Sequence, residues 1–185
     1  MYSNDTLNGS NANAENIGFT ENIIKCGDNI GQYVSVAVDS SNGIHIAAFD
    51  SSDSDLKYIY LSSYTQTTPT KEFTVDAAGA VGVWTQIKIH NNVPYIAYYN
   101  STETGGRDTI KLAYPTVAAI ADIANGIDSG NYTTGAWEYM TIPALTPPQG
   151  GSAKFRNVCL DFDSAGNPVV GYLGTNLEFG KWLGE

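Results

Sequence analysis

The chain has 185 residues, the length of one ordinary domain, and its 42% hydrophobic content is enough for a sizeable core. Only 15% of the residues are charged, and 19 acidic against 9 basic residues give a formal net charge of −10. Nucleic acids and anionic membrane surfaces require a basic face, so this composition argues against both as partners. No apolar stretch approaches the length that crosses a membrane, and we expect no membrane insertion.

The polar residues are mainly Asn, Ser, Thr and Gly, and the chain holds 12 tyrosines. This balance is commoner in secreted and cell-surface β-proteins than in cytosolic enzymes, so we expect an extracellular, periplasmic or surface location. Met1 is followed by no apolar run, and we expect any targeting segment to lie outside this chain. Cys26 and Cys159 show neither metal spacing nor a redox pair, which predicts two buried thiols, with a disulfide as the alternative.

Residues 1–18 predict a flexible lead, because they carry too little apolar surface to offset the entropy of ordering. From Phe19 onward the chain is typical of short strands. Residues 33–39 alternate valines with small or polar residues, which is the period of a strand. The pair Asn42-Gly43 then suits a turn with positive φ. The next strands of this unit are expected at residues 44–50 and 56–61.

The same order of strands returns twice. The second copy is expected at residues 84–90, 93–100 and 110–114, and the third at residues 155–161, 168–174 and 177–181. The columns agree in chemistry: the aromatic column is Tyr33, Trp84 and Phe155, the small column is Ala47, Ala97 and Gly171, and the third-strand column is Leu56, Ile110 and Leu177. A fourth kind of strand precedes each unit, at residues 22–26, 72–76 and 137–142.

An insertion at residues 116–135 lengthens the second unit. Its apolar residues recur at helical spacing, which predicts a short helix followed by a Gly- and Asn-rich loop. The insertion separates the third strand of this unit from its fourth, so residues 137–142 form a delayed fourth strand.

Repeats of this length with four strands each predict an all-β fold of β-propeller blades within residues 19–185, at about 19–63, 71–115 and 136–183. The sequence resembles the blade repeats of bacterial secreted and surface proteins. An aromatic residue opens the inner strand, a D-S-x-G or N-N turn follows, and P-x-[IV]-[AG]-Y comes next. The chain departs from the Asp-box type of propeller, because it has no S-x-D-x-G-x-T-W run.

Three four-stranded blades are too few to close a ring, since propellers usually have about 4–8. Two chains could close a six-bladed homodimer in which residues 22–26 of one chain complete the last blade of the other. Further blades of a longer chain are the alternative. A two-sheet sandwich that only looks repetitive is a third possibility.

Two polar columns follow the predicted inner strands, and we expect them to form a ligand-binding channel mouth. They are Ser35, Gln86 and Asn157 in one column, and Asp39, His90 and Asp161 in the other. The alternative is that these side chains only bond to backbone and water around a wet channel.

Asp50, Asp53 and Asp55 place three carboxylates on one loop, which is the oxygen chemistry that calcium prefers. The loop lacks the Gly and the distal Glu of a calcium loop, so a solvated loop is the alternative reading. We expect no other cofactor.

The residues assemble no catalytic set. His45 and His90 lie on different kinds of strand, and no G-x-S-x-G occurs. Arg107 and Arg156 do not form the arginine cluster of a sialidase site. We therefore expect a non-catalytic module that binds a glycan or a protein through the propeller face. A glycan-active hydrolase or lyase that uses carboxylates at the channel mouth is the alternative.

Overall fold

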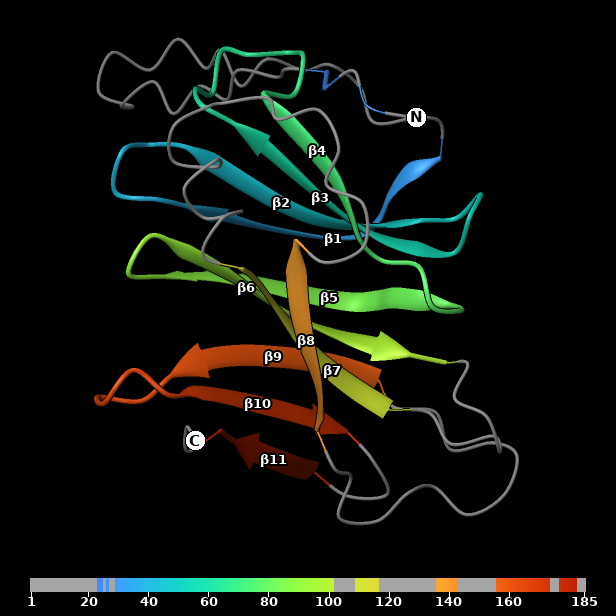
Figure 1. The fold of residues 1–185 in the computed structure, drawn as a ribbon, viewed down its shortest axis with the longest axis vertical. Coiled ribbons are helices and arrows are strands. Elements are labelled where there is room, and N and C mark those ends of the chain that lie inside the picture. The colour runs from blue at the N-terminus through green and yellow to red at the C-terminus, as the bar shows by residue number, and fades with distance from the viewer. Residues whose placement is uncertain are drawn as a thin grey trace, which may run out of the picture.

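A computed structural model describes residues 23, 24, 26, 29–101, 109–116, 136–142, 156–173 and 177–182. All regular structure in these residues is β-strand, and no helix occurs among them. The strands form three antiparallel sheets, two of four strands and one of three, so the predicted all-β class is confirmed (Figure 1). The two-sheet sandwich does not fit this arrangement.

Each sheet is a meander in which consecutive strands pair. Sheet 1 contains β1 (Ile30–Val38), β2 (Ile44–Asp50), β3 (Asp55–Leu61) and β4 (Lys71–Asp76) in that order. Sheet 2 contains β5 (Val81–His90), β6 (Val93–Asn100), β7 (Thr109–Pro115) and β8 (Trp137–Ile142) in that order. Sheet 3 contains β9 (Arg156–Phe162), β10 (Pro168–Leu173) and β11 (Leu177–Lys181), with β10 in the centre.

The fourth strands close the outer edges of sheets 1 and 2. β4 pairs with β3, and β8 pairs with β7, so residues 137–142 are the delayed fourth strand of the second unit as predicted. Sheet 3 has three strands in the described part of the chain, not the expected four. Ile23, Ile24 and Cys26 lie outside any strand, since no neighbouring strand pairs with them. The predicted lead at 1–18 and the predicted helix in the insertion lie outside the described residues.

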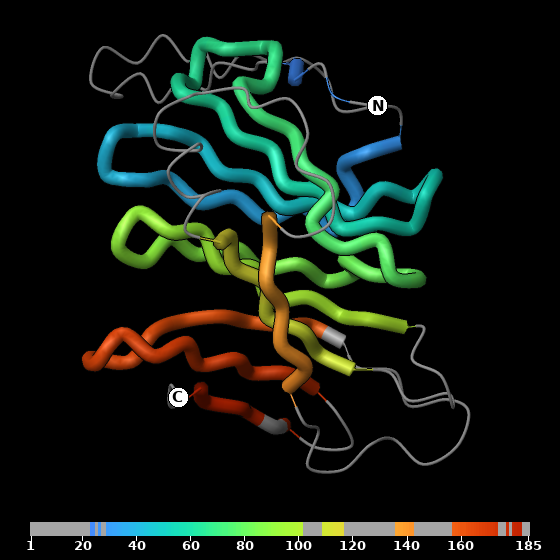
Figure 2. Tube along the Cα trace, viewed as in Figure 1, coloured from blue at the N-terminus to red at the C-terminus, as the bar shows by residue number. Residues whose placement is uncertain are grey.

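The three sheets stack face to face, with sheet 2 in the middle (Figure 2). One apolar cluster joins sheet 1 to sheet 2 and includes Tyr58 and Trp137, whose rings lie 5.0 Å apart. A second cluster joins sheet 2 to sheet 3 and includes Leu112 and Tyr172. Sheet 2 therefore buries both of its faces. The first strands of the sheets are neighbours in space, because β5 contacts both β1 and β9.

The same β-bulge occurs in the first strand of every sheet. In each case two residues oppose a single residue of the next strand, which is Ala48, Tyr98 or Tyr172. The first residue of each bulge has positive φ: 51° at Tyr33, 57° at Trp84 and 55° at Asn157. This conformation is rare for residues other than Gly, and in a bulge it bends the strand. The bulge gives the three sheets a common register.

This register corrects one predicted alignment. Ala47, Ala97 and Gly171 are equivalent as predicted, and their partners on the first strands are Ser35, Gln86 and Cys159. Cys159, not Asn157, is thus the counterpart of Ser35 and Gln86. Phe155 resembles Tyr33 and Trp84 in residue type, but Asn157 occupies their bulge position. The third-strand column is confirmed, because Leu56, Ile110 and Leu177 all have equivalent partners.

Candidate functional site at the hairpin rim

The hairpins that join the first and second strands lie on one side of all three sheets, at the left in Figure 1. We call their turns, residues 39–43, 90–93 and 163–167, the hairpin rim. Each turn begins with a polar residue, which is Asp39, His90 or Asp163. The predicted column is therefore right for Asp39 and His90. In sheet 3 the equivalent residue is Asp163, because Asp161 lies two residues earlier, within β9 and opposite Val169.

The first turn is held by its own carboxylate. Asp39 Oδ1 accepts hydrogen bonds from the backbone N–H of Ser41 at 2.8 Å and of Gly43 at 2.7 Å. Such a side-chain-to-backbone turn is the ordinary role of Asp in a tight connection. Only glycine fits at position 43, since an added Cβ would lie 2.5 Å from Asp39 Oδ2.

The third turn repeats this arrangement. Asp163 Oδ1 accepts from the backbone N–H of Ala165 at 2.9 Å and of Asn167 at 2.8 Å. Its other oxygen, Oδ2, lies 2.5 Å from Lys181 Nζ on β11. The Lys181 ammonium and the hydrogen bonds from Asn167 hold the pKa of Asp163 well below its usual range. The carboxylate is therefore ionised at neutral pH and fully engaged within its own sheet.

The middle turn begins with His90 and is not held by an aspartate. Asn91 and Asn92 have φ of 51° and 61°, which is the two-residue turn that suits a twisted hairpin. His90 stacks on Phe162 of sheet 3, with ring centroids 4.4 Å apart and ring planes inclined by 16°. Ser40 Oγ of the first turn donates to Asn92 Oδ1 at 2.9 Å. These two contacts link the middle turn to the first turn and to Phe162, the residue before the third turn.

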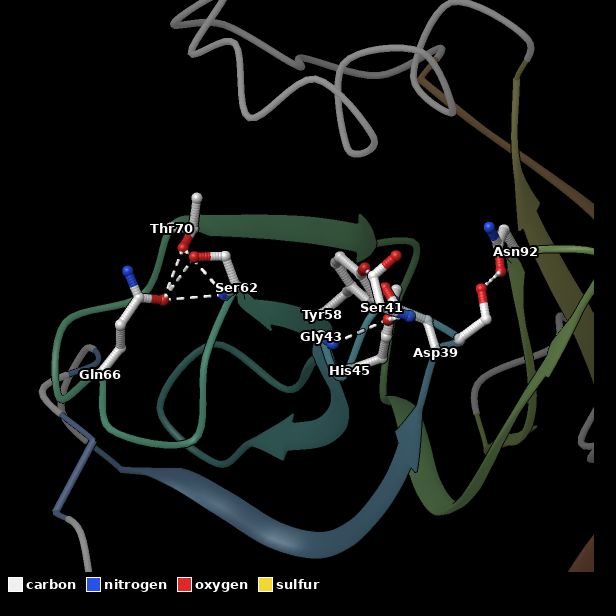
Figure 3. A network of polar contacts seen from close by, with 10 residues as sticks. Asp39, Ser41, Gly43, His45, Tyr58, Ser62, Gln66, Thr70 and Asn92 are labelled. Carbon is white, nitrogen blue, oxygen red and sulfur yellow. Dashed lines mark hydrogen bonds and ion pairs between the residues drawn. The ribbon is translucent and has the colours of Figure 1, made fainter.

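A buried hydrogen-bond relay supports the first turn (Figure 3). His45 Nε2 lies 3.1 Å from Asp39 Oδ2, and His45 Nδ1 lies 2.7 Å from the Tyr58 hydroxyl. Burial lowers the pKa of His45 although Asp39 acts to raise it, and burial holds the pKa of Tyr58 well above its usual range. The neutral imidazole consequently donates from Nε2 to Asp39 and accepts from Tyr58 at Nδ1.

This relay contains residue types that occur in catalytic sites, but a substrate has no access to it. His45 is 1% exposed, so a substrate cannot reach its ring nitrogens. Burial acts to raise the pKa of Asp39, but hydrogen bonds from the Gly43 amide, His45 and the Ser41 amide lower it overall. We interpret the relay as the support of the turn. The sequence analysis missed it because the partner of Asp39 comes from the opposite strand, where His45 faces Ala37.

The loop after β3 adds a second polar cluster on the rim side (Figure 3). Gln66 Oε1 accepts from the Ser62 backbone N–H at 2.8 Å and from the Thr70 hydroxyl at 2.9 Å. β3 ends at Leu61, opposite Ile44 at the start of β2, so this loop leaves the sheet beside the first turn. One glutamine thus holds the loop in shape.

Ser35, the first residue of one predicted polar column, makes a hydrogen bond between sheets 1 and 2. Ser35 Oγ accepts a hydrogen bond from the backbone N–H of Ile87 at 3.0 Å. In the opposite direction, the Thr85 hydroxyl donates to the backbone carbonyl of Tyr33. These reciprocal bonds tie β1 to β5. Ser35 is therefore engaged by the neighbouring backbone, which is the alternative that the sequence analysis left open for it.

The three aspartates predicted as a calcium site differ in exposure and in their partners. Asp50 and Asp55 are buried, whereas Asp53 is exposed on the loop between them. Lys57 Nζ lies 3.6 Å from Asp50 Oδ2 and 3.9 Å from Asp55 Oδ2, so one ammonium group already lies between these two carboxylates. Burial raises the pKa of Asp55, and Lys57 opposes that shift. Within the described ranges, no three His, Cys, Asp or Glu residues are placed to hold a metal ion.

A buried charge cluster between sheets 1 and 2 was not foreseen. Asp76 ends β4, and its Oδ2 accepts from the Tyr98 hydroxyl at 2.7 Å and lies 3.1 Å from Lys111 Nζ. Asp76 and Lys111 are both buried. No local pattern in the sequence signals this cluster, because its three members come from strands of two different sheets.

No family model matches the chain, and no curated protein matches it either. The part of the chain that the structure describes contains no helix long and apolar enough to cross a membrane. Cys26 and Cys159 are free thiols. Cys159 is exposed on β9 rather than buried as predicted, since no sheet of the described residues packs against its side of sheet 3.

Proposed function

We propose that the three sheets are blades of a β-propeller and that the chain is a non-catalytic module that binds a glycan at the hairpin rim. The meander order of each sheet, the adjacent first strands and the shared bulge support the propeller arrangement. Propellers commonly bind ligands at one end of the ring. The three turns of the rim lie together on one side of the sheets, which would be an end of the proposed ring (Figure 1).

The chemistry of the rim supports a neutral, polyhydroxylated ligand. Its exposed polar side chains are hydroxyls and amides, namely Ser40, Ser41, Asn42, Asn91, Asn92 and Ser164. Hydroxyls and amides both donate and accept hydrogen bonds, as the hydroxyls of a sugar do. Several such groups held on rigid hairpins supply the few well-placed polar contacts that fix the orientation of a ligand.

The contacts of two rim aspartates favour glycan binding over glycan hydrolysis. Asp39 and Asp163 each accept two backbone N–H groups of their own turn, and each also contacts a side chain, His45 or Lys181. A glycosidase needs one carboxylic acid that keeps its proton near neutral pH, so the pKa of that group must be raised. The pKa values of Asp39 and Asp163 are both lowered, so neither group suits the role of the acid.

The test is a glycan array, followed by calorimetry and by product analysis on every glycan that binds. Asn91→Gly/Asn92→Gly removes both amides of the middle turn while glycine preserves its positive φ. We expect this variant to weaken binding by at least about tenfold, since two polar contacts are lost. Asn29→Gly is the matched control, because Asn29 also has positive φ, 63°, and lies at the opposite end of β1.

Binding without product formation, together with loss of binding in the rim variant, would support the proposal. Release of cleaved sugar would contradict it and favour the hydrolase alternative. Binding that the rim variant retains, or binding to proteins alone, would place the ligand site elsewhere or change its ligand class.

A further inference from the structure

The outer face of sheet 3 exposes apolar side chains at positions that the other two sheets bury. Leu177 and Phe179 of β11 are 85% and 71% exposed. Their counterparts by register in sheet 2, Ile110 and Leu112, are both 1% exposed because sheet 3 covers them. The counterparts in sheet 1 are Leu56 and Tyr58, which are both 0% exposed beneath sheet 2. We call this side of each sheet its back face.

The outer face of sheet 1 also exposes apolar side chains, but these lie on the side of the sheet opposite to its back face. Val34, Val36 and Val38 of β1 are 53%, 61% and 58% exposed. The residues of β5 that correspond to Val34 and Val36 are Thr85 and Ile87, which are only 3% and 2% exposed against sheet 1. We call this side of each sheet its front face. Among the described residues, sheet 1 therefore has no neighbouring sheet on its front face along β1, although Ile59 and Leu61 of that face, on β3, are buried.

The two exposed faces are complementary in kind. At both internal interfaces the back face of one sheet packs on the front face of the next. What sheet 3 exposes is a back face, and what sheet 1 exposes is a front face. Rows of exposed apolar residues of this kind mark interaction surfaces in soluble proteins. The partner that fits each end is thus a further sheet with the same repeat.

We propose that a second copy of this chain covers both ends, with sheet 3 of each copy packed on sheet 1 of the other. Propellers have about 4–8 blades, and two copies of the three sheets formed by the described residues give six. The assembly has twofold symmetry with two identical interfaces, and it buries both apolar ends. This inference rests on the propeller arrangement proposed above and does not depend on the ligand.

The charges on the front face of sheet 1 allow this contact. Lys111 of sheet 2 is paired across the interface with Asp76 of sheet 1. The counterpart of Lys111 in sheet 1 is Lys57, by register. Lys57 is neutralised within sheet 1 by two carboxylates and also donates to Thr74 Oγ1 at 2.7 Å. An apolar back face can therefore pack beside Lys57 without having to supply a carboxylate.

Sedimentation equilibrium tests the proposal on the full chain in the absence of glycan. We expect a mass of twice 19.8 kDa at micromolar concentration. Phe179→Asp and Val36→Asp should each give monomers, because each places a charge in both interfaces of the ring. Tyr64→Asp is the control, since Tyr64 is exposed on the loop after β3 and should leave the dimer intact. Circular dichroism verifies that each variant is folded.

Mixing the two monomeric variants separates this geometry from others. Each mixed pair has one interface of two native faces, so we expect dimers to return in the mixture. A symmetric contact between two copies of sheet 3 would instead leave Val36→Asp dimeric. That result, a monomeric wild-type chain or a polymer of larger mass would each overturn the proposal. A monomer would leave the glycan proposal standing, because the rim lies within one chain.

Discussion

Removal of the Asp76 carboxylate should be among the most damaging single changes in this protein. Asp76 receives hydrogen bonds from the Tyr98 hydroxyl and from Lys111 Nζ across the interface of sheets 1 and 2, and from the Ala78 backbone N–H at 2.9 Å in its own loop. Asp76→Ala leaves a buried ammonium and a buried hydroxyl without this acceptor. Truncation of one member of a buried ion pair costs about 3–5 kcal/mol.

A chain of this size loses about 2–4 °C in Tm for each kcal/mol, so we expect Asp76→Ala to melt roughly 6–20 °C lower. Urea denaturation followed by tryptophan fluorescence measures the free energy of unfolding directly. Asp53→Ala is the control, because Asp53 is exposed and its replacement should change stability by less than about 0.5 kcal/mol.

A triple variant separates the loss of pairing from the loss of packing. Asp76→Leu/Tyr98→Phe/Lys111→Met removes all three polar groups together, so no buried charge is left without a partner. We expect it to be more stable than Asp76→Ala, because apolar replacement of a whole buried ion pair is often neutral. If Asp76→Ala were within about 1 kcal/mol of the wild type, the buried-pair reasoning would be refuted.

Three further predictions concern the contacts between sheets and turns. Thr85→Val should cost about 1 kcal/mol through the lost bond to the Tyr33 carbonyl, whereas exposed Thr141→Val should be neutral in the same urea assay. Gly166→Ala should cost more than Gly31→Ala: both have positive φ, 83° and 131°, but a Cβ at 166 would lie 2.7 Å from His90 Nε2 and a Cβ at 31 would meet nothing. Equal losses would show that His90 does not pack on that turn. The pKa of His45 is lowered from 6.5 in the folded protein, so the stability it contributes is complete above pH 6.5 and is lost as the pH falls through the lowered value. Thermal unfolding between pH 7.5 and 5 should show this loss in the wild type and less of it in His45→Gln, and identical pH slopes would contradict the assignment.

The repeat pattern allowed most of the fold to be predicted, because period-two alternation and turn residues are local signals. The second and third strands were aligned correctly, since Ala47, Ala97 and Gly171 leave little freedom of register. The predicted first strand of sheet 3 is two residues out of register, because Phe155 matches Tyr33 and Trp84 in residue type whereas Asn157 matches them in position. The shared Asp-Ser pair that begins two of the turns, at Asp39 and Asp163, is the signal that would have aligned it.

The site was less predictable than the fold, for a physical reason. Asp39 and His90 were identified from their place at the end of a strand, but their partners come from other strands and other sheets. His45 reaches Asp39 across a hairpin, and Phe162 reaches His90 from the next sheet. Such pairs depend on how the sheets stack, and single-strand periodicity carries no information about stacking.

A disulfide cross-link would test most directly whether the contact between sheets is repeated between two copies. Within the chain, Ser35 Oγ lies 3.0 Å from the backbone nitrogen of Ile87. The counterparts of Ser35 and Ile87 at the open ends are Cys159 and Val36. In a Cys26→Ser background, Val36→Cys should therefore oxidise to a dimer joined to Cys159 of the second copy. The dimer should be absent in the further variant Cys159→Ser and in a Tyr64→Cys control. A cross-link that persists without Cys159, or none at all, would contradict the account.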